Sequence, residues 1–162
     1  MPNVKQFKLD ASLRAAEVSC AENGARLTQR RRQVLSALMQ SSSPLSAYEV
    51  LDLCNRSAAS AMPAMSVYRI LDFLEQQLLV HRLSSSNKYV SCAHIACDHK
   101  HFQATHFLLC EGCSSVEEVD ATEEASEALE QMAKTVGFKL TTQQFELSGI
   151  CTTCQNSAGG GL

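Results

Sequence analysis

The sequence predicts an α+β protein: an N-terminal winged helix-turn-helix followed by a C-terminal α/β domain that carries a four-cysteine zinc site. Three observations predict it. Apolar residues recur at helical spacing up to about residue 77, the period then changes to two, and two Cys-x-x-Cys pairs lie in the second half. We place the winged-helix domain at residues 1–84, with its wing extending to about 92, and the second domain at 93–162.

The expected helices of the first domain begin at recognisable capping residues. Thr28 and Ser66 are good N-caps, and Ser46 with Glu49 three residues later forms a capping box. Gly24 ends the first helix. The four expected helices cover residues 10–23, 29–40, 47–56 and 67–77.

After the fourth helix, side-chain character repeats every two residues, which predicts two strands at residues 79–83 and 89–92 joined by a turn at 84–88. Helices followed by a β-hairpin indicate a winged helix, in which a late helix enters the major groove of DNA. Tyr68 and Arg69 lie where that helix would point at base edges, although Tyr68 also suits a core position. The Arg30–Arg32 run suits either phosphate contacts or a solvated helix face.

Composition and charge agree with a folded protein. Of the 162 residues, 45% are hydrophobic and 19% are charged, which suits a packed core. No run reaches the roughly 18 apolar residues of a membrane span, and the opening lacks a secretory apolar region, so we expect a cytoplasmic protein with no membrane partner. Residues 1–82 carry +3 and residues 83–162 carry −6, which sum to −3. The basic half suits a polyanionic partner, although such a charge is also common by chance.

The cysteine spacing is the most specific signal. Cys110 with Cys113 and Cys151 with Cys154 supply the four thiolates of a structural zinc site. A redox dithiol is the rival interpretation, but one Cys-x-x-Cys suffices for that chemistry. Around these pairs the sequence predicts a strand at 115–119, a helix at about 123–136 ended by Gly137, and a long strand at 138–150.

A second cluster of imidazoles and thiols lies between the two domains in the sequence. His81 and Cys92 fall on the two hairpin strands, and a metal held there would fix the angle between the domains. A lone His is more often a surface residue, which is the simpler interpretation of His94 and His106. A zinc hydrolase or deaminase would need an His-x-Glu pair, and no His here is followed by x-Glu. We expect no enzymatic activity and no small-molecule substrate.

Five segments in order make the sequence resemble the ferric uptake regulator family, and within it the branch of zinc uptake regulators. They are RLTQRRRQVL, LSAYEVLDLC, SVYRILDFLEQQLLVHRLSSSNKYVSC, CEGC and CTTC, spanning residues 26 to 154. The resemblance implies a homodimeric, metal-dependent transcription factor that binds double-stranded operator DNA, with 93–162 as the metal-binding dimerisation domain.

The resemblance also implies roles for single residues. The regulatory zinc ligands would be His81, Cys92, His101 and Glu118, with His99 as the rival of His101 and Cys97 as a further rival; with the four-cysteine site this makes about two zinc ions per subunit. Tyr48 and Arg69 match family positions that contact operator bases. Together with Ser66, Tyr68 and Arg31 they make up the expected DNA-binding residues. Asp52 matches a dimer–dimer contact, but its expected Arg partner position is Asn55, with Arg56 one step later.

The expected function is therefore repression of zinc-uptake genes by a zinc-loaded dimer on palindromic promoter operators. The alternatives are an iron, manganese or peroxide sensor of the same family, or a zinc-binding module without DNA binding. A thiolate such as Cys92 in the sensing site favours the softer metal.

Overall fold

The computed structural model describes residues 4–56, 61–95, 105–142 and 144–158, and the chain divides into two compact units, Met1–His99 and Lys100–Leu162. None of the helices in the described ranges combines the length and the apolar character needed to cross a membrane.

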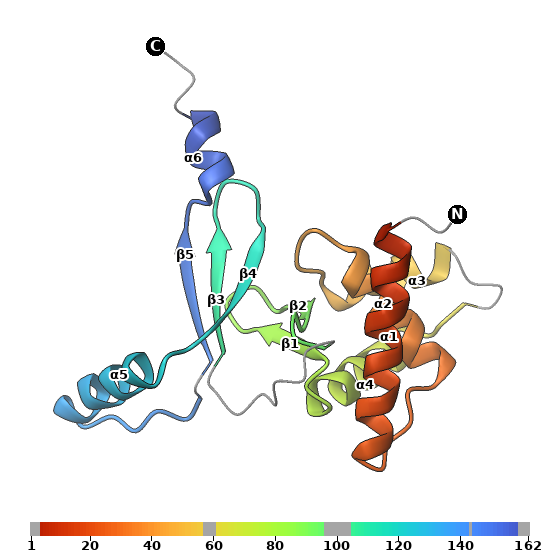
Figure 1. Ribbon diagram of the computed structural model, residues 1–162, viewed down its shortest axis with the longest axis horizontal. Helices are drawn as coiled ribbons and strands as arrows, with labels where there is room; N and C mark the ends of the chain where they lie inside the picture. The colour runs from red at the N-terminus through yellow and green to blue at the C-terminus, as the bar shows by residue number, and fades with distance from the viewer. Residues whose placement is uncertain (1–3, 57–60, 96–104, 143, 159–162) are drawn as a thin grey trace. The chain divides into compact units, whose positions relative to one another are not determined.

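The first unit contains four helices and a two-stranded hairpin (Figure 1). The elements in chain order are α1 (Val4–Glu22), α2 (Gln29–Gln40), α3 (Ala47–Arg56), α4 (Ala64–Gln76), β1 (Val80–Leu83) and β2 (Lys88–Ser91). Strands β1 and β2 pair antiparallel, with His81 opposite Val90. Leu45, which precedes α3, forms an isolated antiparallel bridge with Tyr89 of β2 and so ties the segment before α3 to the wing.

The helix caps of this unit test the expected boundaries. Thr28 accepts a hydrogen bond from the Arg31 amide, as expected of an N-cap. The cap of α4 was expected at Ser66, and this is wrong: α4 begins at Ala64 behind Pro63, whose φ of −66° suits the entry to a helix. Ser66 therefore lies in the first turn of α4. Helix α1 also begins earlier than the expected residue 10.

One hydrophobic core holds the first unit together. Each of α1 to α4 contributes buried side chains, and the hairpin adds Val80 and Tyr89. Val34, Leu35, Val50, Leu71 and Leu74 have no exposed surface. Apolar burial of this kind contributes roughly 25 cal/mol per Å² and stabilises the unit.

The second unit is a three-stranded sheet with two helices at opposite ends (Figure 1). Its elements are β3 (Thr105–Cys110), β4 (Val116–Asp120), α5 (Glu123–Thr135), β5 (Phe145–Gly149) and α6 (Thr152–Ala158). The strand order is β4-β3-β5, with β4 antiparallel and β5 parallel to β3.

The expected long strand at 138–150 is wrong in its first half. Strand β5 begins at Phe145, where its parallel pairing with residues 106–110 of β3 starts. The segment before β5 is irregular instead: the Thr142 hydroxyl accepts a hydrogen bond from the Gln144 amide. Strand β3 and helix α6 were not expected from the sequence.

Candidate metal centre and nucleic-acid interface

The sheet of the second unit brings the four cysteines to one end. Cys110 ends β3 opposite Gly149 of the parallel strand β5, so the turn after β3 and the segment after β5 begin at the same edge. Cys113 lies in that turn, and Cys151 and Cys154 lie just before and within α6. One sulfur from each of the four falls within 4.8 Å of the others.

The spacing of the sulfurs fits a tetrahedral zinc ion. Bonds of about 2.3 Å to zinc place tetrahedral sulfurs about 3.8 Å apart. The Sγ atoms of Cys113 and Cys151 are 3.7 Å apart. The Cys151 amide donates to Cys110 Sγ over 3.2 Å, and the Ser115 hydroxyl lies 3.2 Å from Cys113 Sγ. The donor set and its spacing therefore fit zinc. The sulfurs of Cys110 and Cys113 also have hydrogen-bond partners that can stabilise them as thiolates.

The same contacts give the thiols of the cluster different pKa values. The backbone N–H of Cys151 lowers the pKa of Cys110 to about 6, and Ser115 lowers the pKa of Cys113. Hydrogen bonding to the Cys151 sulfur raises the pKa of Cys154 to about 12. At neutral pH the cluster thus combines thiolate with thiol, and a cation is needed to hold all four as thiolates.

Gly112 is part of this centre, although the sequence alone did not single it out. A Cβ at this position would lie 2.9 Å from Cys154 Sγ and 3.1 Å from Cys154 Cβ. A side chain at this position would therefore force the turn or α6 to shift, so a glycine allows the closest approach of Cys110 and Cys113 to α6. The signal was present in the sequence as the Glu-Gly between the two cysteines, but its meaning needs the second Cys-x-x-Cys in place.

The wing of the first unit carries the two expected regulatory ligands of that unit. His81 lies on β1, and Cys92 follows β2, where its amide donates to Leu79 O over 3.0 Å. His81 and Leu79 share one face of the hairpin, so His81 and Cys92 are diagonal neighbours on it. A ring nitrogen of His81 and Cys92 Sγ lie within 4.8 Å of each other, and Cys92 is buried.

The remaining expected regulatory ligands divide into two groups. Glu118 lies on β4 of the second unit, opposite Phe107 in the register, and is half-buried. His101 and its rivals His99 and Cys97 lie outside the described residues.

The outer surfaces of α3 and α4 carry the expected DNA contacts of the helix-turn-helix. Tyr48 in the first turn of α3 is 68% exposed, and its ring meets Tyr68 of α4 edge to face at 6.4 Å. Arg69 is exposed beside Tyr68, and Ser66 is half-buried in the first turn of α4. Exposure on one face resolves the alternative for Tyr68: its side chain lies outside the core.

Arg31 differs from these residues in its surroundings. Its guanidinium carbon stacks 3.4 Å from the centre of the Phe73 ring, and its Nη1 donates to Arg26 O over 2.6 Å. These contacts hold Arg31 against α4. In the same helix Arg32 pairs with Glu17 of α1. The Arg run therefore contributes contacts between helices, a role that was not expected from the sequence.

Asn55, at the position where an Arg was expected, has a structural role at the end of α3. Its Oδ1 accepts from the Met62 amide at 2.7 Å, and its Nδ2 donates to Met62 O at 3.3 Å. Asn55 thus fastens the segment that leads into α4. Asp52 and Arg56 form an ion pair with each other along the exposed face of α3.

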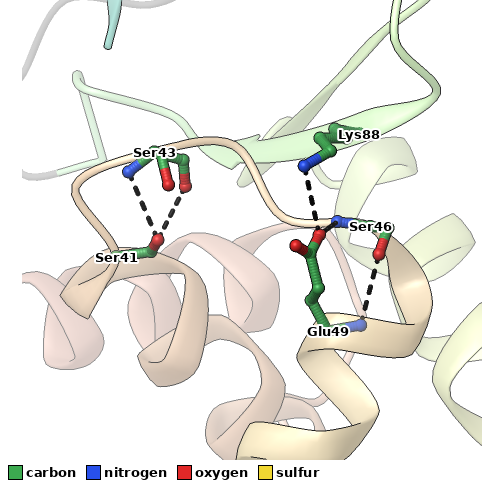
Figure 2. Close-up of polar contacts among 5 residues, drawn as sticks. All are labelled: Ser41, Ser43, Ser46, Glu49 and Lys88. Carbon is green, nitrogen blue, oxygen red and sulfur yellow. Dashed lines mark hydrogen bonds and ion pairs between the residues drawn. The ribbon is translucent and has the colours of Figure 1, made fainter. Parts of the chain in front are cut away.

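The wing is also fastened to the start of α3 (Figure 2). The Ser46 amide donates to Glu49 Oε2 at 2.7 Å, and the Glu49 amide donates to Ser46 Oγ at 3.3 Å, which is the expected capping box. Lys88 Nζ of β2 reaches the same Glu49 oxygen at 3.3 Å. These bonds, with that from the Ser46 backbone first, lower the pKa of Glu49. One carboxylate thereby links the helix and the wing.

Comparisons with known proteins agree with this arrangement. The profile of the ferric uptake regulator family matches residues 22–148. The zinc uptake regulation protein of Escherichia coli is 35% identical over 145 residues, covering 88% of this chain and 80% of that protein. A zinc uptake regulator complexed with zinc and DNA superposes with a TM-score of 0.77 at 30% identity, covering 97% of this chain and 99% of the other.

A second solved structure, holo XcZur, gives a TM-score of 0.73 at 36% identity, covering 89% of this chain and 96% of that chain. The fold class predicted from the sequence is confirmed, including a cluster of four cysteines that fits zinc. The first unit is a winged helix, the second carries the four-cysteine cluster, and the family model and a relative match most of the chain. The protein therefore belongs to the ferric uptake regulator family.

Proposed function

We propose that the protein is a zinc-responsive transcriptional regulator, which binds palindromic promoter operators when it is loaded with zinc and represses zinc-uptake genes. The observation that best supports this proposal is the pair formed by His81 and Cys92 at the wing, which directly follows α4. A thiolate and an imidazole favour zinc over harder ions. The similarity to zinc uptake regulators supports the same metal.

In this proposal His81, Cys92, His101 and Glu118 hold the regulatory zinc, with His99 as the alternative to His101. With the four-cysteine site, this gives about two zinc ions per subunit. The ligands come from the wing and from the second domain of the chain, so metal occupancy is linked to the geometry of the DNA-binding surface. Metal binding and DNA binding must then strengthen each other by the same factor.

The proposed DNA surface consists of Tyr48, Ser66, Tyr68 and Arg69, with Arg31 as a supporting residue behind them. The first turn of α4 would lie in the major groove, and Arg69 suits a bidentate contact with guanine O6 and N7. Arg31 stacks on Phe73 of α4, so its contribution would be to hold that helix in place.

We further propose a homodimer formed through the second unit, because this unit leaves much apolar surface uncovered. Leu108 of β3 and Leu147 of β5 are opposite each other in the register and are 44% and 54% exposed. Phe138 is 70% exposed and Ile150 is 45% exposed. Exposed apolar side chains that adjoin on a sheet, such as Leu108 and Leu147, are typical of interfaces between proteins, and a symmetric dimer would account for a palindromic operator.

Asp52 and Arg56 remain the proposed contact between neighbouring dimers on one operator. Because the two side chains pair within α3, that internal ion pair must open before either residue can pair with another dimer. Opening such an exposed pair costs little, but Asn55 stands at the expected Arg position, so we expect weak cooperativity between dimers.

The test is DNA affinity during a titration of buffered free zinc, using chelator-treated protein that retains its four-cysteine zinc, with iron and manganese in parallel. Binding that tightens with zinc alone, at about two zinc ions per subunit, is the expected result. Tightening only with iron or manganese would move the protein to another branch of the family. Cys92→Ser should abolish the zinc response and leave the four-cysteine zinc in place.

A further inference from the structure

The outer face of α4 begins with an apolar side chain that the core does not explain. Val67, Ile70, Leu71 and Leu74 form the buried face of this helix. Met65 lies on the opposite side and is 66% exposed. Tyr68 follows three residues later and Arg69 four residues later, so these side chains are neighbours of Met65 on the helix surface.

The exposed face extends from α4 to α3. The Tyr48 ring, itself 68% exposed, meets Tyr68 edge to face. Met65, Tyr68 and Tyr48 are therefore exposed side chains of one patch on this face, and Arg69 follows Tyr68 on the same helix. Phosphates are bound by charged and polar donors, which the Met65 side chain lacks, so Met65 needs another partner on a DNA-binding face.

The major groove offers one apolar group, the C5 methyl of thymine. The first turn of a recognition helix is the part that meets base edges. Met65 lies in that turn, and its unbranched thioether side chain adapts readily to such a surface.

We propose that Met65 reads a thymine in each operator half-site by packing against its C5 methyl. This inference rests on the proposed DNA-binding function. Residues four apart on a helix are about 6 Å from each other, and successive base pairs are about 3.4 Å apart. The thymine is therefore expected one to two base pairs from the base that Arg69 reads.

The experiment uses the zinc-loaded full-length protein and a duplex selected by it from random sequences. Each thymine of the half-site is replaced in turn by uracil, which removes the C5 methyl and leaves every hydrogen-bonding group. Loss of one buried methyl contact should weaken wild-type binding about three- to fivefold at one thymine. Met65→Ala should bind more weakly than wild type and should show no sensitivity to uracil at that thymine.

Two variants serve as controls. Met65→Leu keeps the apolar bulk and should retain the sensitivity to uracil. Val18→Ala truncates a side chain of α1 that is 58% exposed and lies outside the patch, so it should bind like wild type.

The outcomes separate this proposal from the function on which it rests. If Met65→Ala binds DNA in response to zinc and keeps the wild-type sensitivity at every thymine, the role of Met65 is overturned and the function stands. If the sensitivity is lost in Tyr68→Ala but kept in Met65→Ala, the tyrosine reads the methyl instead. Absence of any zinc-dependent duplex binding would overturn both proposals.

Discussion

The two units of the chain are stabilised in different ways. In the first unit, four helices and the wing bury a shared core, with side chains such as Leu35 and Leu71 fully enclosed. In the second unit, Phe107 is fully buried, but Leu147 and Phe138 are more than half exposed. The four cysteines gather at one end, where the sheet meets α6. The first unit thus carries its own hydrophobic core, whereas we expect the second to depend on a metal ion and on a covering partner.

Loss of the four-cysteine zinc should have the largest effect, and this effect should differ between the two units. Cys154→Ser, or extraction of the ion with a strong chelator, should unfold the second unit, because a structural zinc site contributes on the order of 10 kcal/mol. The first unit should keep its helical signal and its cooperative thermal transition. Hydrogen exchange measured by mass spectrometry resolves the two regions. Equal loss of protection in α2 and in β3 would show that the two units are not independent.

A truncation in the first core should give the opposite pattern. Leu71→Ala removes a fully buried side chain of α4 and should cost about 2–5 kcal/mol of unfolding free energy. Denaturant unfolding followed by far-UV circular dichroism measures this loss. Zinc retention by the second unit, measured with a colorimetric chelator, should stay at the wild-type level. Faster zinc loss in this variant would contradict the division into two kinds of stability.

Gly112→Ala tests how tightly the metal end of the second unit is packed. The new methyl would approach Cys154 Sγ to 2.9 Å, so the turn or α6 must shift, at a cost of about 1–3 kcal/mol. We expect zinc to be lost to a competing chelator more readily than in wild type. Gly149→Ala is the matched control, because a Cβ there meets nothing within 4 Å. Equal behaviour of the two variants would show that the close approach has no energetic consequence.

The smallest expected effect concerns the link between the wing and α3. Glu49 has a lowered pKa in the folded chain, so it releases its proton more readily there than in the unfolded chain. Its contribution to stability is therefore present at neutral pH and is lost as the pH falls through its folded pKa. Glu49→Gln should flatten the acid side of the stability profile by less than about 1 kcal/mol, because the carboxylate is half exposed. Lys88→Gln keeps the capping box and should preserve most of the wild-type pH dependence.

Local patterns predicted local structure well. Thr28 and the Ser46–Glu49 capping box lie where expected, because a side chain that bonds its own helix end needs no distant partner. The prediction that Ser66 caps α4 was wrong because a second local signal competes with it. Pro63, three residues earlier, is the N-cap residue, and the helix begins at Ala64. The four-cysteine cluster was also predictable, since the ligand types and their spacing define it.

Features that depend on distant partners were not predictable. Strand β3 was overlooked, because its Thr-His-Phe-Leu-Leu-Cys pattern becomes a strand only through its neighbours β4 and β5. The start of β5 was misplaced for the same reason. The sequence marked Asn55 only as a departure from an expected Arg, and its structural role was not predictable because its partner is the Met62 backbone, seven residues later.

The pairing of Leu45 with Tyr89 has a consequence for the dynamics of the first unit. The two residues exchange backbone hydrogen bonds of 3.0 and 2.8 Å, and the chain between them contains the whole of α3, α4 and β1. A displacement of the wing must therefore either break these two hydrogen bonds or displace the segment that leads into α3. Tyr48 of α3, on the proposed DNA-binding surface, should therefore move together with the hairpin, and the amides of Leu45 and Tyr89 should exchange with solvent in a single opening event.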